Sequence, residues 1–574
     1  MSEMIAPERY RSLGELLRDA LLTFKSEVAL VEASRKKEKS AYTYADFSRE
    51  AMKVARQLEE AGVGAGDRVA ILMSNQPRWL ISAYAAMYRG CVLVPLDYKL
   101  ETPEQAALLA HAKPQALFVE YAIYRLFGDG DIDVPFTVVS EAPTSEDPME
   151  LGAARRYEDF LEGQGGDVAP PTFVQRERED VAAIVYSSGT GGRPKGCMLT
   201  HDAYLEQYRG LGSLFPMTTG DRYFSILPTN HTIDFMVGFV GPICGGAAII
   251  HQRSLRPEFI NWTMKEYGVT HMAVVPLILE AFERRIRERL HDTKPTTRGF
   301  LEILTSVNQL LTDRKPNHDV SRRLLKPVHD AFGGHLKMIF CGGAFTDQAR
   351  TEFFYRLGIP VVIGYGLTEA CTVATVNDLK PFRGDSVGKA VDGVQIRIDT
   401  PTGQGIGQVL VKGRTLMKGY LDDDEQTAES IKNGWLQTGD LGWLDASGHL
   451  HLVGRSKTMT VTAGGKNVYP EDIEQKFEGL PCDELAVFAT NFIWPGGELE
   501  DELLVAVYRG EDGDDEALRS ELAQRNHRLP DFKRVGGLVR WDDDFPRTAS
   551  MKLKRGVLAD SLRENLERAA IRPL

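Results

Sequence analysis

The alternation of amphipathic helices and short apolar strands near the N-terminus constrains the fold more than any other feature of the sequence. Between Tyr42 and Pro114 two helical patterns and two strand-like runs take turns, in the order YTYADFSREAMKVARQLEEAG, VAILMS, PRWLISAYAAMYRG and CVLVPLD. This order is typical of an α/β layered domain, in which helices cover a sheet. Further short strands are expected at 116–119, 182–186, 223–226, 247–250, 272–275 and 337–340.

The pattern changes twice after these strands. Residues 280–332 are rich in Arg, Leu and Lys at helical spacing and predict consecutive helices, whereas glycine-punctuated short strands follow Val387. We therefore predict an α/β fold with a large N-terminal domain of layered sheets and helices, including a β-rich subdomain, and a small mobile α+β C-terminal domain. The expected boundaries are 1–454 for the first domain, 455–457 for a hinge and 458–574 for the second.

Composition excludes several classes of protein. Sixty-eight basic and 81 acidic residues give a net charge of −13 without an extended basic tract, which argues against a nucleic-acid partner. The six cysteines form no CxxC pair, so a zinc cluster or a disulfide framework has little support. The N-terminal residues lack a secretory signal, and the uncharged run 235–250 is too short and too rich in glycine for a transmembrane segment. We expect a cytoplasmic protein.

A glycine-rich loop, YSSGTGGRPKG at 186–196, is the sharpest local motif. Its hydroxyls can donate to an anion, its glycines let backbone amides approach closely, and Lys195 adds positive charge. The candidate phosphate-binding residues are Ser187, Ser188, Gly189, Thr190 and Lys195. The loop follows an apolar strand, and we expect a helical segment after it. It is not a Walker A sequence, because a proline precedes the lysine. Taken alone, the motif also fits a flexible surface loop.

The loop is followed by further motifs in a fixed order: LPTNH at 227–231, GGA at 342–344, GYGLTE at 364–369, GWLQTGD at 434–440, GRSK at 454–457, GGK at 464–466 and PRTASMK at 546–552. Together they resemble the motifs of the adenylate-forming superfamily, which contains acyl-CoA synthetases, luciferases and the adenylation domains of peptide synthetases. The helical stretch 280–332 makes the chain most similar to the fatty-acid CoA ligases. The resemblance extends from about Tyr42 to Leu558.

This resemblance implies a role for each motif. The implied catalytic residues are Lys552, His231, Thr368 and Glu369. Beyond the phosphate loop, the implied nucleotide-binding residues are Gly343, Ala344, Tyr365, Asp440 and Arg455. Glu369 and Thr190 would hold Mg²⁺, Lys457 would be the hinge residue, and Gly464 and Gly465 would line the channel for CoA.

Several of these residues also have an ordinary structural interpretation. Tyr365 can present an aromatic face to a purine or simply pack in the core. Glu369 offers the oxygen ligands that Mg²⁺ needs, but a solvated turn also uses such an acid. Asp440, which we place after a glycine in a turn at a strand end, can accept hydrogen bonds from ribose hydroxyls or merely form the turn. A lone His231 is often a structural residue.

The implied function is an ATP-dependent acyl-CoA synthetase. A carboxylate attacks the α-phosphorus of ATP, pyrophosphate leaves, and the acyl group of the acyl-AMP passes to the thiol of CoA after the small domain rotates. The expected substrate is a medium- or long-chain fatty acid. One alternative is a ligase that loads an acyl carrier protein in trans, and another is a regulator that binds nucleotide or acyl groups without turnover.

Three departures from the family pattern bear on these alternatives. Gly191 stands where the phosphate loop usually has Thr, Asn230 replaces an aromatic gate before the histidine, and Met551 replaces the glycine before the catalytic lysine. None of the three removes a charged catalytic group, so we expect an active enzyme.

Overall fold

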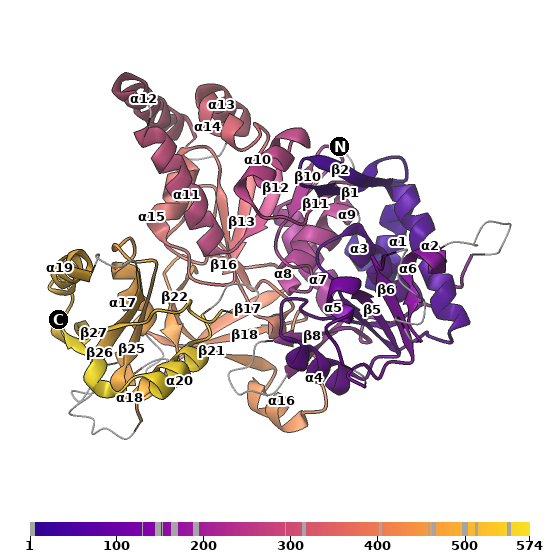
Figure 1. Ribbon diagram of the computed structural model, residues 1–574. Helices are drawn as coiled ribbons and strands as arrows, with labels where there is room; N and C mark the ends of the chain where they lie inside the picture. The colour runs from indigo at the N-terminus through magenta and orange to yellow at the C-terminus, as the bar shows by residue number, and fades with distance from the viewer. Residues whose placement is uncertain are drawn as a thin grey trace. The chain divides into compact units, whose positions relative to one another are not determined.

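The computed structural model describes residues 6–128, 130–143, 151, 153–161, 170–187, 195–292, 294–312, 317–400, 405–456, 460–461, 467–495, 503–510, 515–547 and 553–574. The chain forms two compact units (Figure 1). Unit 1 comprises residues 1–396 and 411–436, and unit 2 comprises residues 397–410 and 437–574. No helix within the described ranges is long and apolar enough to cross a membrane.

Unit 1 contains a nine-stranded mixed sheet. Its strand order is β16 (Lys389–Ala390), β15 (Thr375–Val376), β14 (Val361–Tyr365), β13 (Met338–Gly342), β12 (His271–Val274), β10 (Arg222–Ser225), β11 (Ala248–Gln252), β1 (Val28–Ser34) and β2 (Lys37–Thr43). The strands from β14 to β1 run parallel, whereas β15, β16 and β2 are antiparallel to their neighbours. The carboxyl ends of β13 and β14 therefore meet at one edge of the sheet.

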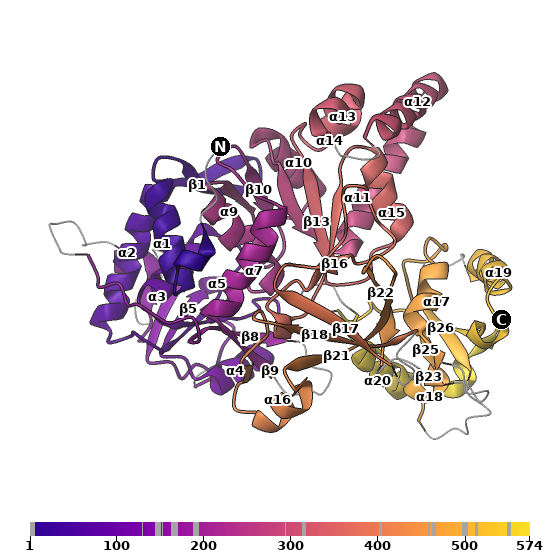
Figure 2. The same ribbon diagram turned by 180° about the vertical axis from the view of Figure 1, so that it is seen from behind.

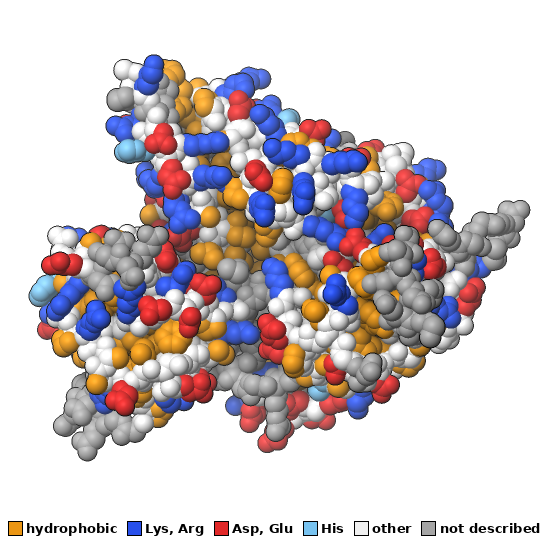
Figure 3. Space-filling view, in the orientation of Figure 1, with side chains coloured by type: hydrophobic (Ala, Val, Ile, Leu, Met, Phe, Trp, Pro, Cys, Tyr) orange, Lys and Arg blue, Asp and Glu red, His pale blue; other side chains and the backbone are white. Residues whose placement is uncertain are grey.

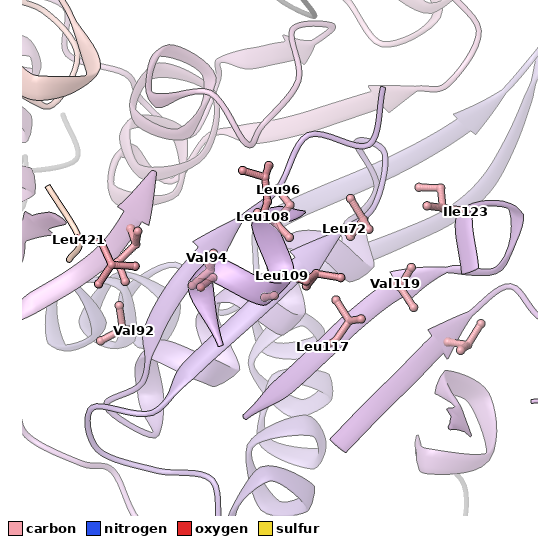
Figure 4. Close-up of a cluster of buried hydrophobic side chains, with 14 of the residues drawn as sticks. Leu72, Val92, Val94, Leu96, Leu108, Leu109, Leu117, Val119, Ile123 and Leu421 are labelled. Carbon is pink, nitrogen blue, oxygen red and sulfur yellow. The ribbon is translucent and has the colours of Figure 1, made fainter. Parts of the chain in front are cut away.

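An eight-stranded sheet is the second layer of unit 1. Its order is β19 (Gly419–Tyr420), β9 (Lys195–Thr200), β8 (Val181–Ser187), β4 (Val92–Pro95), β3 (Arg68–Leu72), β5 (Ala116–Glu120), β6 (Phe136–Ser140) and β7 (Arg155–Arg156). Figure 4 shows its core, in which Leu72, Val94, Leu117 and Val119 from adjacent strands pack together with Leu108 and Leu109 of a helix. The central strands β3, β4, β5 and β6 are mostly apolar and buried, as expected of strands in a sheet that helices cover.

The helices of unit 1 alternate with these strands as the sequence predicts. They are α1 (Leu13–Thr23), α2 (Tyr44–Glu60), α3 (Pro77–Tyr88), α4 (Thr102–Ala112), α5 (Tyr121–Tyr124), α6 (Tyr157–Leu161), α7 (His201–Leu214), α8 (Thr232–Asp234), α9 (Gly241–Gly245), α10 (Pro257–Glu266), α11 (Pro276–His291), α12 (Pro295–Thr312), α13 (His318–Leu324), α14 (Lys326–Ala331), α15 (Gln348–Arg356) and α16 (Asp424–Ser430). Helices α1, α2 and α3 pack on one another (Figures 1 and 2). The expected run of helices at 280–332 is confirmed by α11 to α14.

Five strands between residues 394 and 455 form a further sheet, which confirms the β-rich region expected after Val387. Its order is β17 (Val394–Asp399), β18 (Gly407–Gly413), β21 (Trp435–Leu444) and β20 (Ile431–Lys432), with β22 (Leu450–Arg455) also paired to β21.

The C-terminal part of unit 2 is an α+β structure. Four strands are ordered β25 (Glu484–Ala489), β26 (Leu504–Arg509), β27 (Val535–Arg540) and β28 (Arg572–Pro573), and β23 (Thr460–Val461) pairs with β24 (Asn467–Val468). Its helices are α17 (Pro470–Lys476), α18 (Thr490–Ile493), α19 (Asp515–Asn526) and α20 (Arg555–Asn565). Apolar side chains of β25 and β26 reach both faces of the four-stranded sheet and form two core clusters.

Two local predictions are wrong. The phosphate loop is followed by strand β9, not by a helix, because residues 195–200 pair antiparallel with β8; helix α7 begins only at His201. Asp440 lies inside β21 and not in a turn at a strand end, because β22 pairs with this part of the strand and keeps it extended.

Candidate functional site

The ends of β8 and β9 hold the glycine-rich loop. Ser187 and Lys195 are register partners in this antiparallel pair, so the loop begins and ends at adjacent points of the sheet. The residues between them, among which Ser188, Gly189 and Thr190 were predicted to bind phosphate, lie outside the described residues. The hairpin nevertheless fixes where Lys195 enters the sheet.

Lys195 contacts residues that are far away in the sequence. Its Nζ donates a hydrogen bond to Gln426 Oε1 at 2.9 Å and lies 5.3 Å from the centre of the Tyr420 ring. Tyr420 is brought here because β19 pairs with β9, which places it opposite Cys197. The ammonium group therefore lies over an aromatic face, where the ring quadrupole attracts a cation.

Tyr420 also joins this hairpin to Glu369. The Tyr420 hydroxyl donates to Glu369 Oε1 at 2.9 Å, and the Met417 amide donates to the Glu369 carbonyl at 2.8 Å. Burial, assisted by the Glu369 carboxylate, raises the pKa of Tyr420, so its hydroxyl remains a donor at neutral pH. Tyr420 thus contacts both Lys195 and Glu369, two residues predicted for the site, although the sequence analysis did not predict Tyr420 itself.

Thr368 and Glu369 lie in a 3-10 turn just after β14. Glu369 is half-buried, and one partly accessible carboxylate fits Mg²⁺, which binds through one or two carboxylates and takes its remaining ligands from water and substrate phosphates. Within the described residues, no cluster of three His, Cys, Asp or Glu side chains forms a complete metal cage. The donor set therefore suits a cation that arrives with a nucleotide.

Three predicted nucleotide-binding residues, Gly343, Ala344 and Tyr365, lie at the carboxyl ends of β13 and β14. Gly342, the last residue of β13, pairs with Gly364 of β14. Gly343 and Ala344, which follow β13, therefore lie beside Tyr365, the last residue of β14. The Tyr365 side chain is buried. Glycine is required at 366, because an added Cβ would lie 1.9 Å from the Thr372 carbonyl oxygen.

His231 lies at the N-terminal end of α8, in the loop that follows β10. Its Nε2 is 3.9 Å from Asp97 Oδ2, and its side chain is 30% exposed. The predicted residue is thus accessible and next to a carboxylate.

A buried network fixes the loop that carries His231. Asp234 is fully buried and accepts hydrogen bonds from Tyr223 (2.8 Å), Ser225 (3.1 Å) and Thr229 (2.8 Å). Asn75 accepts from the Thr229 amide at 2.9 Å and donates to Ser225 Oγ at 2.8 Å. Burial raises the pKa of Asp234 from 3.8 to about 6.

Sequence reasoning missed both Asn75 and Asp234. The available signal was an acid three residues after His231 inside an otherwise apolar run, and such an acid needs partners when it is buried. A π-helical turn, Phe235–Val240, follows Asp234 directly. Glycine at position 238 leaves room for the Asp234 carboxylate, because a Cβ added at Gly238 would lie 2.4 Å from Asp234 Oδ1.

An apolar cavity opens beside these elements in unit 1. Its described lining contains no charged side chain; it consists of Tyr208, Leu211, Gly212, Phe215, Pro216, Met217, Ile233, Met236, Val237, Gly241, Gly245, Phe340, Cys341, Gly342, Gly343, Val362, Gly364, Gly366, Thr372, Val373 and Val376. Five of these residues lie between positions 233 and 245, and Gly343 is a predicted nucleotide-binding residue. The cavity therefore adjoins the predicted nucleotide loops.

Unit 2 holds the remaining described site residues. Asp440 of β21 and Arg455 of β22 are register partners, and Arg455 Nε donates to Asp440 Oδ1 at 2.7 Å. The Thr438 hydroxyl accepts from the Asp440 amide at 3.0 Å and donates to the Val409 carbonyl at 2.6 Å. The structure thus brings together the acid and the arginine that the resemblance assigns to nucleotide binding.

The other predicted residues of this part of the chain are Lys457, Gly464, Gly465 and Lys552. All four lie outside the described residues.

The chain is similar to known proteins over most of its length. The model of the AMP-binding enzyme family matches residues 17–421. A feruloyl-CoA synthase of Amycolatopsis sp. is 28% identical over 532 residues, which cover 90% of this chain and 93% of the relative. Long-chain-fatty-acid–CoA ligase FadD15 of Mycobacterium tuberculosis is 28% identical over 472 residues, which cover 78% of this chain and 74% of the relative.

Solved structures share the fold over nearly the whole chain. The anthranilate CoA ligase AuaEII in complex with anthranoyl-AMP has a TM-score of 0.76 at 21% identity, with 96% of this chain and 97% of that chain covered. The o-succinylbenzoate CoA synthetase MenE of Bacillus subtilis in complex with ATP and magnesium has a TM-score of 0.71 at 22% identity, with 95% of this chain and 99% of that chain covered.

The fold and the site define an α/β enzyme of the adenylate-forming class. The chain belongs to the AMP-binding enzyme family, and its place is among the acid–thiol ligases of that family.

Proposed function

We propose that the protein is an acyl-CoA synthetase for a medium- or long-chain fatty acid, which it activates with ATP as an acyl-AMP before transfer to CoA. The observation that carries the choice of substrate is the cavity of unit 1, whose described lining lacks a charged group. Apolar walls of this kind bind a hydrocarbon by removing it from water.

The few polar groups of the lining support a chain without hydroxyl or amino groups. The Thr372 hydroxyl donates to the Thr232 carbonyl at 3.0 Å, and Cys341 Sγ lies 3.5 Å from the Thr346 hydroxyl. A phenolic acid such as a ferulate would bury its hydroxyl in a lining with few polar groups, which costs free energy.

The adenylation step follows from the charges of the site. Lys195 and the amides of the glycine-rich loop would hold the ATP phosphates, while Glu369, oriented by Tyr420, would hold Mg²⁺. When bound, Mg²⁺ would neutralise charge on the phosphates. His231 would lie near the reacting carboxylate, and Lys552 would stabilise the charge that develops as the carboxylate attacks the α-phosphorus and pyrophosphate leaves.

Nucleotide orientation and thioester formation are assigned to the C-terminal part of the chain. Asp440 and Arg455 would bind the ribose, since a carboxylate accepts from both hydroxyls and a guanidinium adds a fork of donors. In the second step, the domain that we place at 458–574 rotates about Lys457 and presents Gly464 and Gly465 to the pantetheine arm of CoA.

Two variants separate the half-reactions. Lys552→Ala is expected to suppress acid-dependent pyrophosphate release by about 100-fold or more, while acyl-AMP supplied from outside is still converted to thioester. Gly465→Trp is expected to do the reverse, because its side chain blocks the thiol channel and spares adenylation. Equal loss of both half-reactions in Lys552→Ala would contradict the assigned role.

The identity of the acceptor distinguishes the alternatives. Acyl-CoA formed from free CoA supports the proposal, whereas transfer only to a carrier-protein phosphopantetheine would make the protein a carrier-loading ligase. ATP binding without pyrophosphate release for any acid would indicate a regulator.

A further inference from the structure

Helix α12 is attached to unit 1 through only one of its faces. On that face Asn308 and Thr312 are buried. The side-chain amide of Asn308 donates from Nδ2 to the Arg356 carbonyl at 3.1 Å, and the Tyr355 hydroxyl donates to the Thr312 carbonyl at 2.9 Å. Leu304 packs against a small apolar cluster beneath the helix. The helix is therefore a fixed part of the unit and not a free arm.

A second face of α12 is apolar and exposed to solvent. Its side chains and their exposed fractions are Phe300 (60%), Ile303 (62%), Val307 (40%), Leu310 (83%) and Leu311 (62%). At 100° per residue these positions fall within an arc of about 100°, so they form one continuous stripe. Elsewhere in the described chain, large exposed apolar side chains are spread over many elements. Five within twelve residues mark an interaction surface.

The chain that leads into this stripe is basic. From Glu283 to Arg298 there are six basic and three acidic residues, a net charge of +3, although the whole chain carries −13. Glu283 is paired with Arg287 (Nη2 to Oε1, 2.6 Å). The basic residues are Arg284, Arg285, Arg287, Arg289, Lys294 and Arg298. Most of them lie on the last turns of α11 and in the connection to α12, and hence beside the N-terminal end of the stripe. Figure 3 shows hydrophobic and basic side chains at this end of unit 1, where Figure 1 places α12.

We infer that the α12 stripe docks on the surface of an anionic lipid bilayer. An amphipathic helix lies in the plane of the interface with its apolar face among the acyl chains, and neighbouring Lys and Arg side chains reach the lipid phosphates. The shallow arc and the fixed attachment of α12 suit a flat surface, because a protein groove would need to enclose more of the helix. Local positive charge also complements anionic headgroups.

The inference is independent of the proposed substrate, since the helix lies apart from the residues that line the cavity. If the substrate is a fatty acid, docking brings the enzyme to the phase in which such acids dissolve.

Vesicle sedimentation of the full chain, without ATP or acid, tests the inference. The wild type is expected to bind vesicles of phosphatidylcholine mixed with phosphatidylglycerol, less tightly at high salt, and weakly to phosphatidylcholine alone. Ile303→Asp/Leu310→Asp should lower partitioning by about 100-fold, because two apolar groups are lost and two negative charges are added. Leu126→Asp/Leu214→Asp is the matched control, since both side chains are exposed (64% and 53%) and lie outside α12.

Because the substituted side chains of α12 are exposed, the variant should keep its unfolding midpoint. Absence of wild-type binding to the anionic vesicles, or equal binding by wild type and the α12 variant, would overturn the inference. Light scattering without lipid gives a further test: a wild-type dimer that the α12 variant dissociates would identify the stripe as a contact between copies of the chain and overturn membrane docking.

Discussion

Replacing Asp234 with Asn should remove a specific part of the pH dependence of stability. The buried carboxyl has its pKa raised from 3.8 to about 6 by burial. Because this pKa is higher in the folded than in the unfolded state, the contribution of the Asp234 carboxyl to the free energy of unfolding is complete below about pH 4. That contribution is lost as the pH rises through about 6. A shift of about two units corresponds to about 3 kcal/mol, of which about 2 kcal/mol falls between about pH 4.5 and pH 7.5. Asn does not titrate, so its contribution is constant.

The measurement is urea unfolding of the full chain across this pH range, followed by tryptophan fluorescence. Trp79 is a suitable reporter, because it is buried and its ring centre lies 6.3 Å from that of Phe235, next to Asp234. The free energy of unfolding of Asp234→Asn should gain about 2 kcal/mol relative to wild type between about pH 4.5 and pH 7.5. Other titrating groups are common to both proteins and cancel in the difference.

Thr229→Val is the matched control. It removes one hydrogen bond to the carboxylate but keeps the titrating group, so the loss of stability with rising pH should persist and become steeper. Parallel profiles for wild type and Asp234→Asn, differing by a constant, would refute the reasoning.

Two further predictions concern catalysis. Tyr420→Phe removes the hydroxyl that orients Glu369 and should lower the rate of pyrophosphate release about tenfold while raising the Mg²⁺ concentration required for half-maximal rate; an unchanged Mg²⁺ requirement would show that the hydroxyl has only a structural role. Gly241→Leu should shift acid preference by several carbons toward shorter chains in a competition between acids, because the nearest atom to an added Cβ is the Met236 carbonyl oxygen at 3.2 Å and the side chain would enter the cavity. Gly220→Leu, at an open position outside the cavity, should keep the wild-type preference.

Local patterns allowed much of the fold to be predicted. Helices α2 and α3 and strands β3, β4 and β5 lie within a few residues of their predicted bounds, because each carries its own periodicity. The motifs likewise indicated Lys195, Glu369, Asp440 and Arg455, whose residue types suit nucleotide chemistry.

Features that depend on distant pairing were not predictable in this way. Tyr420 reaches Lys195 and Glu369 only because β19 pairs with β9, and no local pattern marks that pairing. The run 195–200 forms a strand because β8 lies beside it, although the following helix dominates the local pattern. Asp234 acquires its partners from β10 and the loop after it, so its burial is a property of the assembled sheet.

The most direct test of the central claim is pyrophosphate release from ATP and Mg²⁺ across a panel of short, medium, long and aromatic acids, with and without CoA. The proposed function predicts release that depends on a medium- or long-chain fatty acid and is accelerated by CoA, with acyl-CoA as the product. Release with an aromatic acid alone would contradict the assigned substrate, and no release with any acid would contradict adenylation itself.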